Sequence, residues 1–230
     1  DIIINLVGLT SVELCEENPN LAYLVNTKTV ENIVDWIKKF KSNCYLIHIS
    51  TDHVYDGLGP HDESHVTLTN TYAITKYAAE ISASQINSAI IRTNFVGKSK
   101  ALGRESLTDW IYTSLKSCKS VDVLGDVFFS PLSLDSISAI IEKFILQNIC
   151  GTFNAGSHSG LSKADFDFIF SKMLNLDSSL MRKISCKDAP FLKAYRPKDM
   201  RMSSKKLEKV LNLTLPNLTE EIIHIHHEYK

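Results

Sequence analysis

The sequence predicts an α/β fold: a doubly wound parallel sheet covered by helices, followed by a smaller α/β unit. The apolar runs at 2–7, 45–49 and 89–93 are continuous rather than alternating. Such runs are typical of strands that are buried on both faces of a parallel sheet. Segments with helical periodicity separate them, and parallel strands need crossover connections of this kind. We therefore expect residues 1–97 to form the sheet domain.

The composition narrows the class of protein. A chain of 230 residues with 44% hydrophobic and 22% charged residues is typical of globular proteins. Lys and Arg (25) balance Asp and Glu (26), which argues against nucleic acid or an anionic membrane as the main partner. No apolar run approaches the ~20 residues that a membrane span needs. Five scattered cysteines without a Cys-x-x-Cys pair favour reduced thiols in the cytoplasm over disulfides, and the sequence predicts no metal site.

The first elements follow from local signals. The run Asp1–Gly8 predicts a buried strand that starts at residue 1 without an initiator Met, so we expect the chain to begin inside a longer protein. Asn18-Pro19 marks a helix start, with Asn as N-cap and Pro at the first helical position. Apolar residues at helical spacing continue to Ile37, and 45–49 is the next strand. A polar stretch at 50–71 precedes a helix at 72–85.

The second half is less regular. We expect helices at 106–116, 204–211 and 219–227, and strands at 121–124 and 152–154. Asp135 is expected to cap a helix over 133–147, and Ser162 begins another through a capping-box pattern. We assign residues 98–230 mainly to the second unit, and expect the 133–147 helix to pack back on the sheet domain.

Polar side chains follow the second predicted strand directly. Ser50-Thr51-Asp52-His53 begins where 45–49 ends. Ligands of parallel sheets bind outside the carboxyl ends of the strands, so these side chains are expected to face a site.

Tyr72 and Lys76 suggest proton transfer. At i and i+4 of a helix they share a face. A tyrosine has a pKa near ~10, and a fixed cation nearby favours the phenolate; lowering that pKa by ~3 units corresponds to about 4 kcal/mol. Thr51 could hold a substrate oxygen in line with the phenol. The alternative is an ordinary pair on the helix surface, and the hydroxyl at the strand end favours the catalytic interpretation.

These motifs carry a family resemblance. Their order is Asn5-Leu6-Val7-Gly8, then Ser50-Thr51-Asp52-His53-Val54-Tyr55-Asp56-Gly57, Tyr72-x-x-x-Lys76 and Arg92-Thr93-Asn94-Phe95-Val96. The chain resembles the extended short-chain dehydrogenase/reductase superfamily, and more narrowly the dTDP-4-dehydrorhamnose reductase-like group. That resemblance implies a Rossmann-type sheet and assigns substrate binding to the second unit.

The resemblance implies roles for individual residues. Thr51, Tyr72 and Lys76 match the catalytic hydroxyl, phenol and ammonium. The positions that match cofactor contacts are Val7, Gly8, Asn26, Tyr72, Lys76, Thr93 and Asn94. The positions that match substrate contacts are Asp52, His53 and Phe95. Arg196 could contact a substrate phosphate, because a guanidinium matches phosphate oxygens, or could be a structural surface arginine.

The sequence also departs from that group. His53 stands where an aromatic Tyr or Phe is usual, and Phe95 where Trp is usual. The group opens with a strand and a Gly-x-x-Gly-x-x-Gly turn that cradles the pyrophosphate. This chain has no such turn, so the resemblance implies about 55–60 preceding residues, on the order of two βα units.

The implied function is reduction of a 4-keto nucleotide sugar with NADPH or NADH, as in dTDP-rhamnose biosynthesis, with Tyr72 as proton donor. An epimerase or dehydratase acting on a nucleotide sugar is an alternative that Asp52 supports, and it would show no net cofactor oxidation. A second alternative is a non-catalytic subunit resembling the regulatory subunit of methionine adenosyltransferase. The resemblance also raises a homodimer as the oligomeric state to test.

Overall fold

The computed structural model describes residues 1–41, 43–101 and 103–230. Its helices are α1 (Val12–Glu17), α2 (Pro19–Ala22), η1 (Tyr23–Lys28, π-helical), α3 (Thr29–Phe40), α4 (Thr71–Ala83), α5 (Leu107–Lys116), α6 (Leu134–Gln147), α7 (Lys163–Met173), α8 (Lys205–Leu211) and α9 (Leu218–His226), with 3₁₀ turns η2 (Asp52–Val54), η3 (Ser178–Leu180), η4 (Cys186–Asp188) and η5 (His227–Tyr229). Its strands are β1 (Ile2–Asn5), β2 (Tyr45–Thr51), β3 (Ser88–Thr93), β4 (Phe95–Val96), β5 (Val121–Leu124), β6 (Phe128–Phe129), β7 (Leu132–Ser133), β8 (Gly151–Ala155), β9 (Leu161–Ser162) and β10 (Met181–Ile184).

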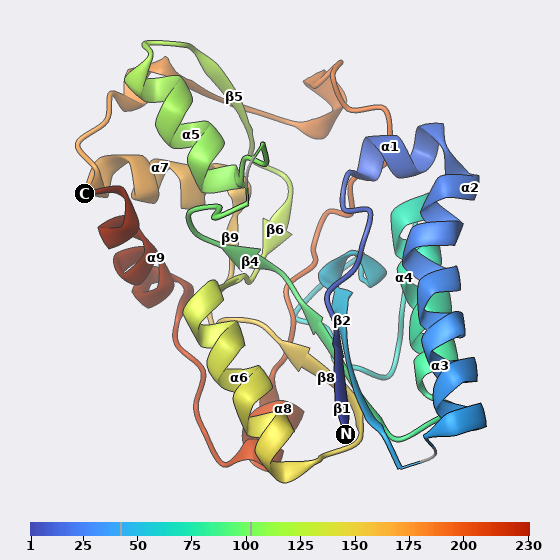
Figure 1. The fold of residues 1–230 in the computed structure, drawn as a ribbon. Coiled ribbons are helices and arrows are strands. Elements are labelled where there is room, and N and C mark those ends of the chain that lie inside the picture. The colour runs from blue at the N-terminus through green and yellow to red at the C-terminus, as the bar shows by residue number, and fades with distance from the viewer. Residues whose placement is uncertain (42, 102) are drawn as a thin grey trace.

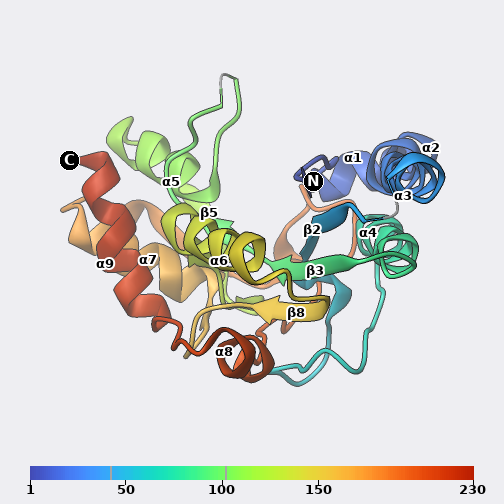
Figure 2. The ribbon, with the colours of Figure 1, turned by 60° about the horizontal axis from the view of Figure 1, so that its bottom comes forward.

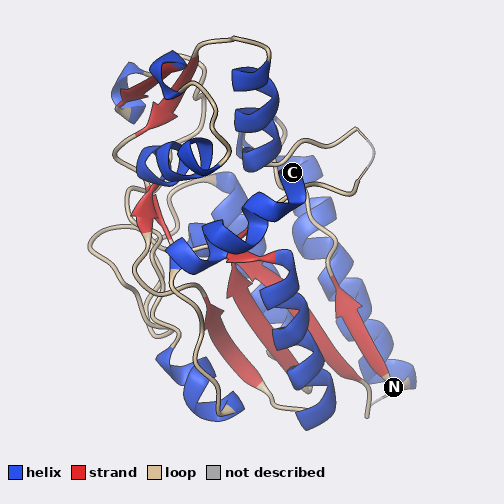
Figure 3. Ribbon diagram, turned by 90° about the vertical axis from the view of Figure 1, so that its left-hand side faces the viewer, coloured by secondary structure: helices blue, strands red, loops and turns tan. Residues whose placement is uncertain are grey.

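The main sheet is parallel throughout and has the order β1-β2-β3-β8. Ile47 of β2 lies opposite Ile4 of β1 and Ala89 of β3, and Ile91 lies opposite Phe153 of β8. The predicted α/β fold with a parallel sheet is therefore confirmed. The carboxyl ends of the strands point toward the part of the molecule that holds the small sheets (Figure 3).

Helices cover both faces of this sheet (Figures 1 and 2). Leu46 and Ile90 pack under α3 and α4, whereas Ile47, Ile49 and Ile91 pack against α6 and α8. Because successive strand residues point to opposite faces, a strand that is covered on both sides must be apolar at nearly every position. That requirement explains the continuous runs in the sequence.

A second core lies beside the main sheet. It joins α5, α7 and α9 to β5 and β10, with Phe166, Phe170 and Ile222 at its centre. β10 pairs with β5 in parallel, and β4–β7 and β6–β9 form two further short pairs. No helix within the described ranges is both long and apolar enough to cross a membrane.

One detail differs from expectation. The N-cap of α6 is Ser133, whose hydroxyl accepts the N–H of Ser136; the expectation that Asp135 caps this helix is wrong, and Asp135 lies in the first turn. The strand expected at 152–154 is present as β8 and pairs with β3 in the main sheet. The helix α6 packs on the main sheet through Ile137, Ile140 and Phe144. The division of the chain at residue 97 stays a prediction.

Candidate active site

The end of β2 forms a tight turn that presents three polar side chains. The hydroxyl of Thr51 accepts the backbone N–H of His53 (3.1 Å) and so caps η2. The same hydroxyl donates to Asp52 Oδ1 (3.3 Å). Thr51, Asp52 and His53 are all buried. The structure thus holds the Thr51 hydroxyl at the carboxyl end of the sheet, where the sequence placed it.

The helix α4 carries Tyr72 and Lys76 on one buried face. It begins at Asn70, whose side chain accepts the N–H of Ala73 (2.8 Å). The exposed fractions of Tyr72 and Lys76 are 8% and 4%. An ordinary surface pair is therefore excluded. The Lys76 ammonium donates to the carbonyl of Ile49 in β2 (2.7 Å), which ties this face of α4 to the strand that ends at Thr51.

Burial dominates the electrostatics of this pair. It raises the pKa of Tyr72 to about 12, although the neighbouring Thr51 hydroxyl opposes the rise. It lowers the pKa of Lys76 to about 8, against the favourable charge of Glu80. The expectation that the pKa of Tyr72 is lowered is wrong for this structure, because burial disfavours the phenolate and the nearby charge of Asp52 raises the pKa further. The phenol is protonated near neutral pH and is suited to donate its proton.

Burial shifts the pKa values of Asp52 and His53 in opposite directions. Burial raises the pKa of Asp52 to about 6, even though Asn94 Nδ2 donates to Asp52 Oδ2 (2.7 Å). Burial lowers the pKa of His53 to about 3, so its imidazole is neutral at pH 7. The His53 ring meets the Tyr72 ring edge to face, with 5.3 Å between centroids. Its Nδ1 has no hydrogen-bond partner in the described part of the chain.

The loop after β1 is fastened by Asn26. Asn26 Oδ1 accepts the N–H of Leu9 (2.7 Å), and Asn26 Nδ2 donates to the carbonyl of Leu9 (3.3 Å) and to Thr75 Oγ1 (3.1 Å). Asn26 lies in the π-helical segment η1, and such segments are frequent at functional sites. This bonding holds Val7 and Gly8 at the edge of the site, with Val7 half exposed.

The donor set fits the nicotinamide-ribose part of a dinucleotide. An ammonium has three N–H donors, and within residues 1–41, 43–101 and 103–230 Lys76 has a single acceptor, the Ile49 carbonyl. Two donors are thus left for vicinal hydroxyls. The exposed Val7 offers apolar surface beside them.

The segment after β3 lies next to this site. Thr93 Oγ1 donates to the carbonyl of Ala155 (2.8 Å) and fastens β3 to β8. Asn94 reaches Asp52, as described above, so two residues separated by 42 positions meet. Phe95 is 52% exposed and free to contact a ligand.

Arg196 has a protein partner. Its Nη2 bonds to a carboxylate oxygen of Glu13 in α1, and the side chain is largely buried. Its charge still acts on His53, so it lies near the site. Arg196 thus has a structural partner in Glu13, and its positive charge also acts on a residue of the candidate site.

Lys163 was missed by sequence reasoning. It is the first residue of α7, and its charge acts on both Asp52 and His53. Four residues along, Asp167 is 1% exposed, and its Oδ1 has no partner among the described residues. The sequence signal here, the capping pattern at Ser162, locates the helix but not what its first side chains approach.

This chain is similar to known proteins over most of its length. A family model described as the RmlD substrate binding domain matches residues 1–230. The dTDP-4-dehydrorhamnose reductase of Sinorhizobium fredii is 25% identical, and the match covers 96% of this chain and 77% of that protein. The methionine adenosyltransferase 2 subunit beta of Pongo abelii is 26% identical over 90% of this chain, but the match spans 64% of that protein.

Among solved structures, this chain is similar to the dTDP-4-dehydrorhamnose reductase of Bacillus anthracis in complex with NADP. The TM-score is 0.90 at 24% identity, and the match covers 99% of this chain and 80% of that one. The two share the α/β fold with its parallel sheet.

Proposed function

This chain belongs to the RmlD substrate-binding-domain family, and from that premise we propose that it is an oxidoreductase that reduces the keto group of a nucleotide-linked sugar with NADPH or NADH. The observation that carries the proposal is the buried arrangement of Thr51, Tyr72 and Lys76 at the carboxyl end of β2. The relatives named as dTDP-4-dehydrorhamnose reductases support a 4-keto sugar on a deoxythymidine diphosphate carrier.

Tyr72 donates the proton. A phenol whose pKa is raised to about 12 keeps its proton at neutral pH and gives it up to the oxygen of a carbonyl that is becoming an alkoxide, a far stronger base. A nicotinamide cofactor held beside these residues would supply the hydride for the carbonyl carbon. Thr51 places its hydroxyl where it holds the substrate oxygen in line with the phenol.

Lys76 stabilises the product state of that transfer. Once the proton has left, the phenolate lies one helical turn from an ammonium that is fixed on the Ile49 carbonyl. A preorganised charge of this kind needs no reorganisation when negative charge develops. The two free N–H donors of Lys76 would hold ribose hydroxyls, beside Val7, Gly8, Asn26, Thr93 and Asn94.

Asp52, His53 and Phe95 would contact the sugar. The neutral His53 imidazole has an unpartnered nitrogen that can accept or donate a hydrogen bond to a sugar hydroxyl. A buried polar atom without a partner is costly unless a ligand satisfies it. Arg196 would act on the substrate phosphates at longer range while it is held by Glu13.

The test is turnover of a dTDP-linked 4-keto-6-deoxyhexose. We expect the absorbance of NADPH at 340 nm to fall with one cofactor oxidised for each sugar reduced, and Tyr72→Phe to abolish the loss. Without net cofactor oxidation, a sugar isomer would establish an epimerase instead, and a sugar product that has lost one water would establish a dehydratase. No reaction, with tight binding to a methionine adenosyltransferase catalytic subunit, would establish the regulatory alternative.

Further aspects belong to the same proposal. We place the protein in the cytoplasm, which the scattered unpaired cysteines support, and expect a homodimer. Light scattering of the purified protein tests the oligomeric state. A mass equal to one chain would contradict the dimer.

A further inference from the structure

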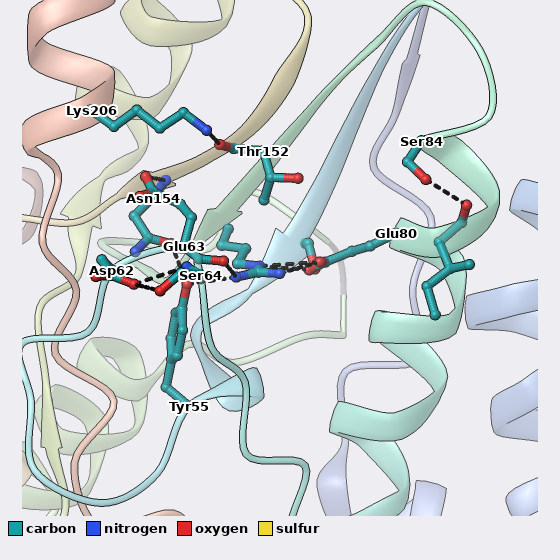
Figure 4. A network of polar contacts seen from close by, with 12 residues as sticks. Tyr55, Asp62, Glu63, Ser64, Glu80, Ser84, Thr152, Asn154 and Lys206 are labelled. Atoms are coloured by element: carbon teal, nitrogen blue, oxygen red, sulfur yellow. Dashed lines mark hydrogen bonds and ion pairs between the residues drawn. The ribbon is translucent and has the colours of Figure 1, made fainter.

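A buried ion pair joins α4, the helix that carries Tyr72 and Lys76, to β3, and it takes no part in the proton transfer. Arg92 of β3 and Glu80 of α4 are 4% and 3% exposed. Arg92 Nη2 donates to Glu80 Oε2 (2.7 Å), and Arg92 Nε donates to both carboxylate oxygens (3.1 Å each). Glu80 reaches from α4 toward the sheet in the network of polar contacts drawn in Figure 4. Burying two charges is expensive, and such pairs do not by themselves argue for stability.

Glu80 connects this pair to the strand end that carries Thr51. The hydroxyl of Ser50, the residue before Thr51, donates to Glu80 Oε1. Lys76, one turn earlier on α4, donates to the Ile49 carbonyl of the same strand. The catalytic helix is therefore bonded to consecutive residues of β2, immediately beside the catalytic hydroxyl.

The other side of Arg92 fastens the loop after the site. Its Nη1 donates to the Tyr55 hydroxyl (2.7 Å) and to the Glu63 carbonyl (3.3 Å). The Tyr55 hydroxyl donates to Asn154 Oδ1 of β8 (2.8 Å). Figure 4 shows Tyr55, Glu63 and Asn154 close together in this network of polar contacts. One network thus spans α4, β2, β3 and β8 and reaches the segment that follows Asp52 and His53.

The negative charge of Glu80 also acts on the pKa of Lys76. The two are four residues apart on α4, and the charge of Glu80 raises the pKa of Lys76 against the stronger lowering by burial. The other titratable groups near Lys76 are Tyr72 on its own helix and His48 on β2, and burial together with the Lys76 charge lowers the pKa of His48. Arg92, on β3, is matched by Glu80. In the described part of the chain, Glu80 is the anion whose charge acts on Lys76.

We propose that Glu80 is a positioning residue of this reductase: bonded to Ser50 and Arg92, it fixes α4 against the catalytic strand end and places a carboxylate one helical turn from the Lys76 ammonium. The role in turnover rests on the proposed function. The electrostatic role does not, and it can be measured on the protein alone.

The experiment compares Glu80→Gln, Glu80→Asp and wild type. Gln keeps the size and hydrogen-bonding capacity but loses the charge, whereas Asp keeps the charge. Asp122→Asn is the matched control, because Asp122 is also bonded by an arginine, Arg182, with both contacts at 2.8 Å, but on the surface of the β10–β5 sheet.

The primary readout is the titration of Lys76 by NMR of protein labelled with ¹³C at lysine Cε, with the signal assigned by Lys76→Arg. A nearby opposite charge shifts a pKa by ~1–3 units, so we expect the pKa of Lys76 to fall by about one unit in Glu80→Gln. Glu80→Asp and Asp122→Asn should leave it near the wild-type value. An unchanged titration in Glu80→Gln overturns the proposal.

The second readout is the pH profile of kcat. As the pH rises, kcat of Glu80→Gln should begin to fall at a lower pH than kcat of wild type, because its Lys76 ammonium loses its proton earlier. Glu80→Asp should restore the wild-type profile. If wild type reduces no keto sugar but the NMR shift is seen, the proposed function fails and the electrostatic role of Glu80 stands. If Glu80→Gln does not fold, Glu80→Gln with Arg92→Met removes both charges. In this double variant, a fall in the Lys76 pKa that is smaller than the one expected for Glu80→Gln alone supports the proposal. No fall, or a rise, overturns it.

Discussion

Replacing Tyr72 by Phe removes one oxygen atom and should abolish most of the chemistry. The ring keeps its place on α4 and its edge-to-face contact with His53. The Thr51 hydroxyl keeps its bonds to the His53 N–H and to Asp52, so no buried group is stranded. Since a single intramolecular hydrogen bond contributes about 0.5–1.5 kcal/mol, the free energy of unfolding should change by no more than about 1.5 kcal/mol.

The loss of rate should be much larger than the loss of stability. General acid catalysis is typically worth ~10²–10⁴-fold, which corresponds to about 3–5 kcal/mol in activation free energy. The raised pKa of Tyr72 places this residue in its acid form over the whole neutral range. Water has little access to a side chain that is 8% exposed, so solvent should replace the lost proton donor poorly.

The assay is a single-turnover measurement at 340 nm with enzyme in excess, so that the chemical step limits the observed rate. Tyr195→Phe is the control: it deletes the same oxygen from a half-exposed tyrosine whose hydroxyl donates to Asp56 Oδ2 (2.9 Å). If Tyr72→Phe retains more than about a third of the wild-type rate in that step, the assignment of the proton donor is wrong.

Three further predictions follow from the same geometry. In wild type, kcat should fall as the pH rises through the Lys76 pKa of about 8; Lys76→Met should remove this limb and weaken NADPH binding, and an unchanged profile with unchanged affinity would contradict both roles. Arg92→Met leaves the Glu80 carboxylate buried and unpaired, so urea unfolding should show a loss of about 3–5 kcal/mol, and a loss below about 1 kcal/mol would refute the account of this pair. The pKa of His53 is lowered to about 3 in the folded state, so the unfolded chain binds the extra proton between about pH 6.5 and 3 and the stability falls as the pH falls. His53→Phe should reduce that fall relative to wild type and raise KM for the sugar, whereas parallel stability curves would show that His53 is not buried as a neutral ring.

The sequence predicted those parts of the site that depend on local periodicity. Tyr72 and Lys76 share a face because of the helical repeat, and the structure buries that face. The strand β2 was recognisable because a strand covered on both faces must be apolar throughout. Asn18-Pro19 started the helix as expected, with the Asn18 side chain accepting the N–H of Leu21.

Other parts depend on contacts between distant residues. The direction of the Tyr72 pKa shift is set by desolvation, which spacing along a helix does not reveal. The charge of Lys163 acts on Asp52, although the two residues lie more than a hundred positions apart in the sequence. The Arg92–Glu80 pair forms only because β3 packs beside α4. Ser133 and Asp135 are both good caps, and the end of β7 at Ser133 decides between them.

The most direct test of the reductase assignment follows the hydride itself. The protein would be incubated with NADPH carrying deuterium at the transferable position of C4 and with a dTDP-linked 4-keto-6-deoxyhexose, and the sugar product analysed by NMR and mass spectrometry. We expect one deuterium on the former carbonyl carbon of the sugar and one NADP⁺ for each product molecule. An unlabelled sugar, or a changed sugar with all of the cofactor still reduced, would contradict the assignment.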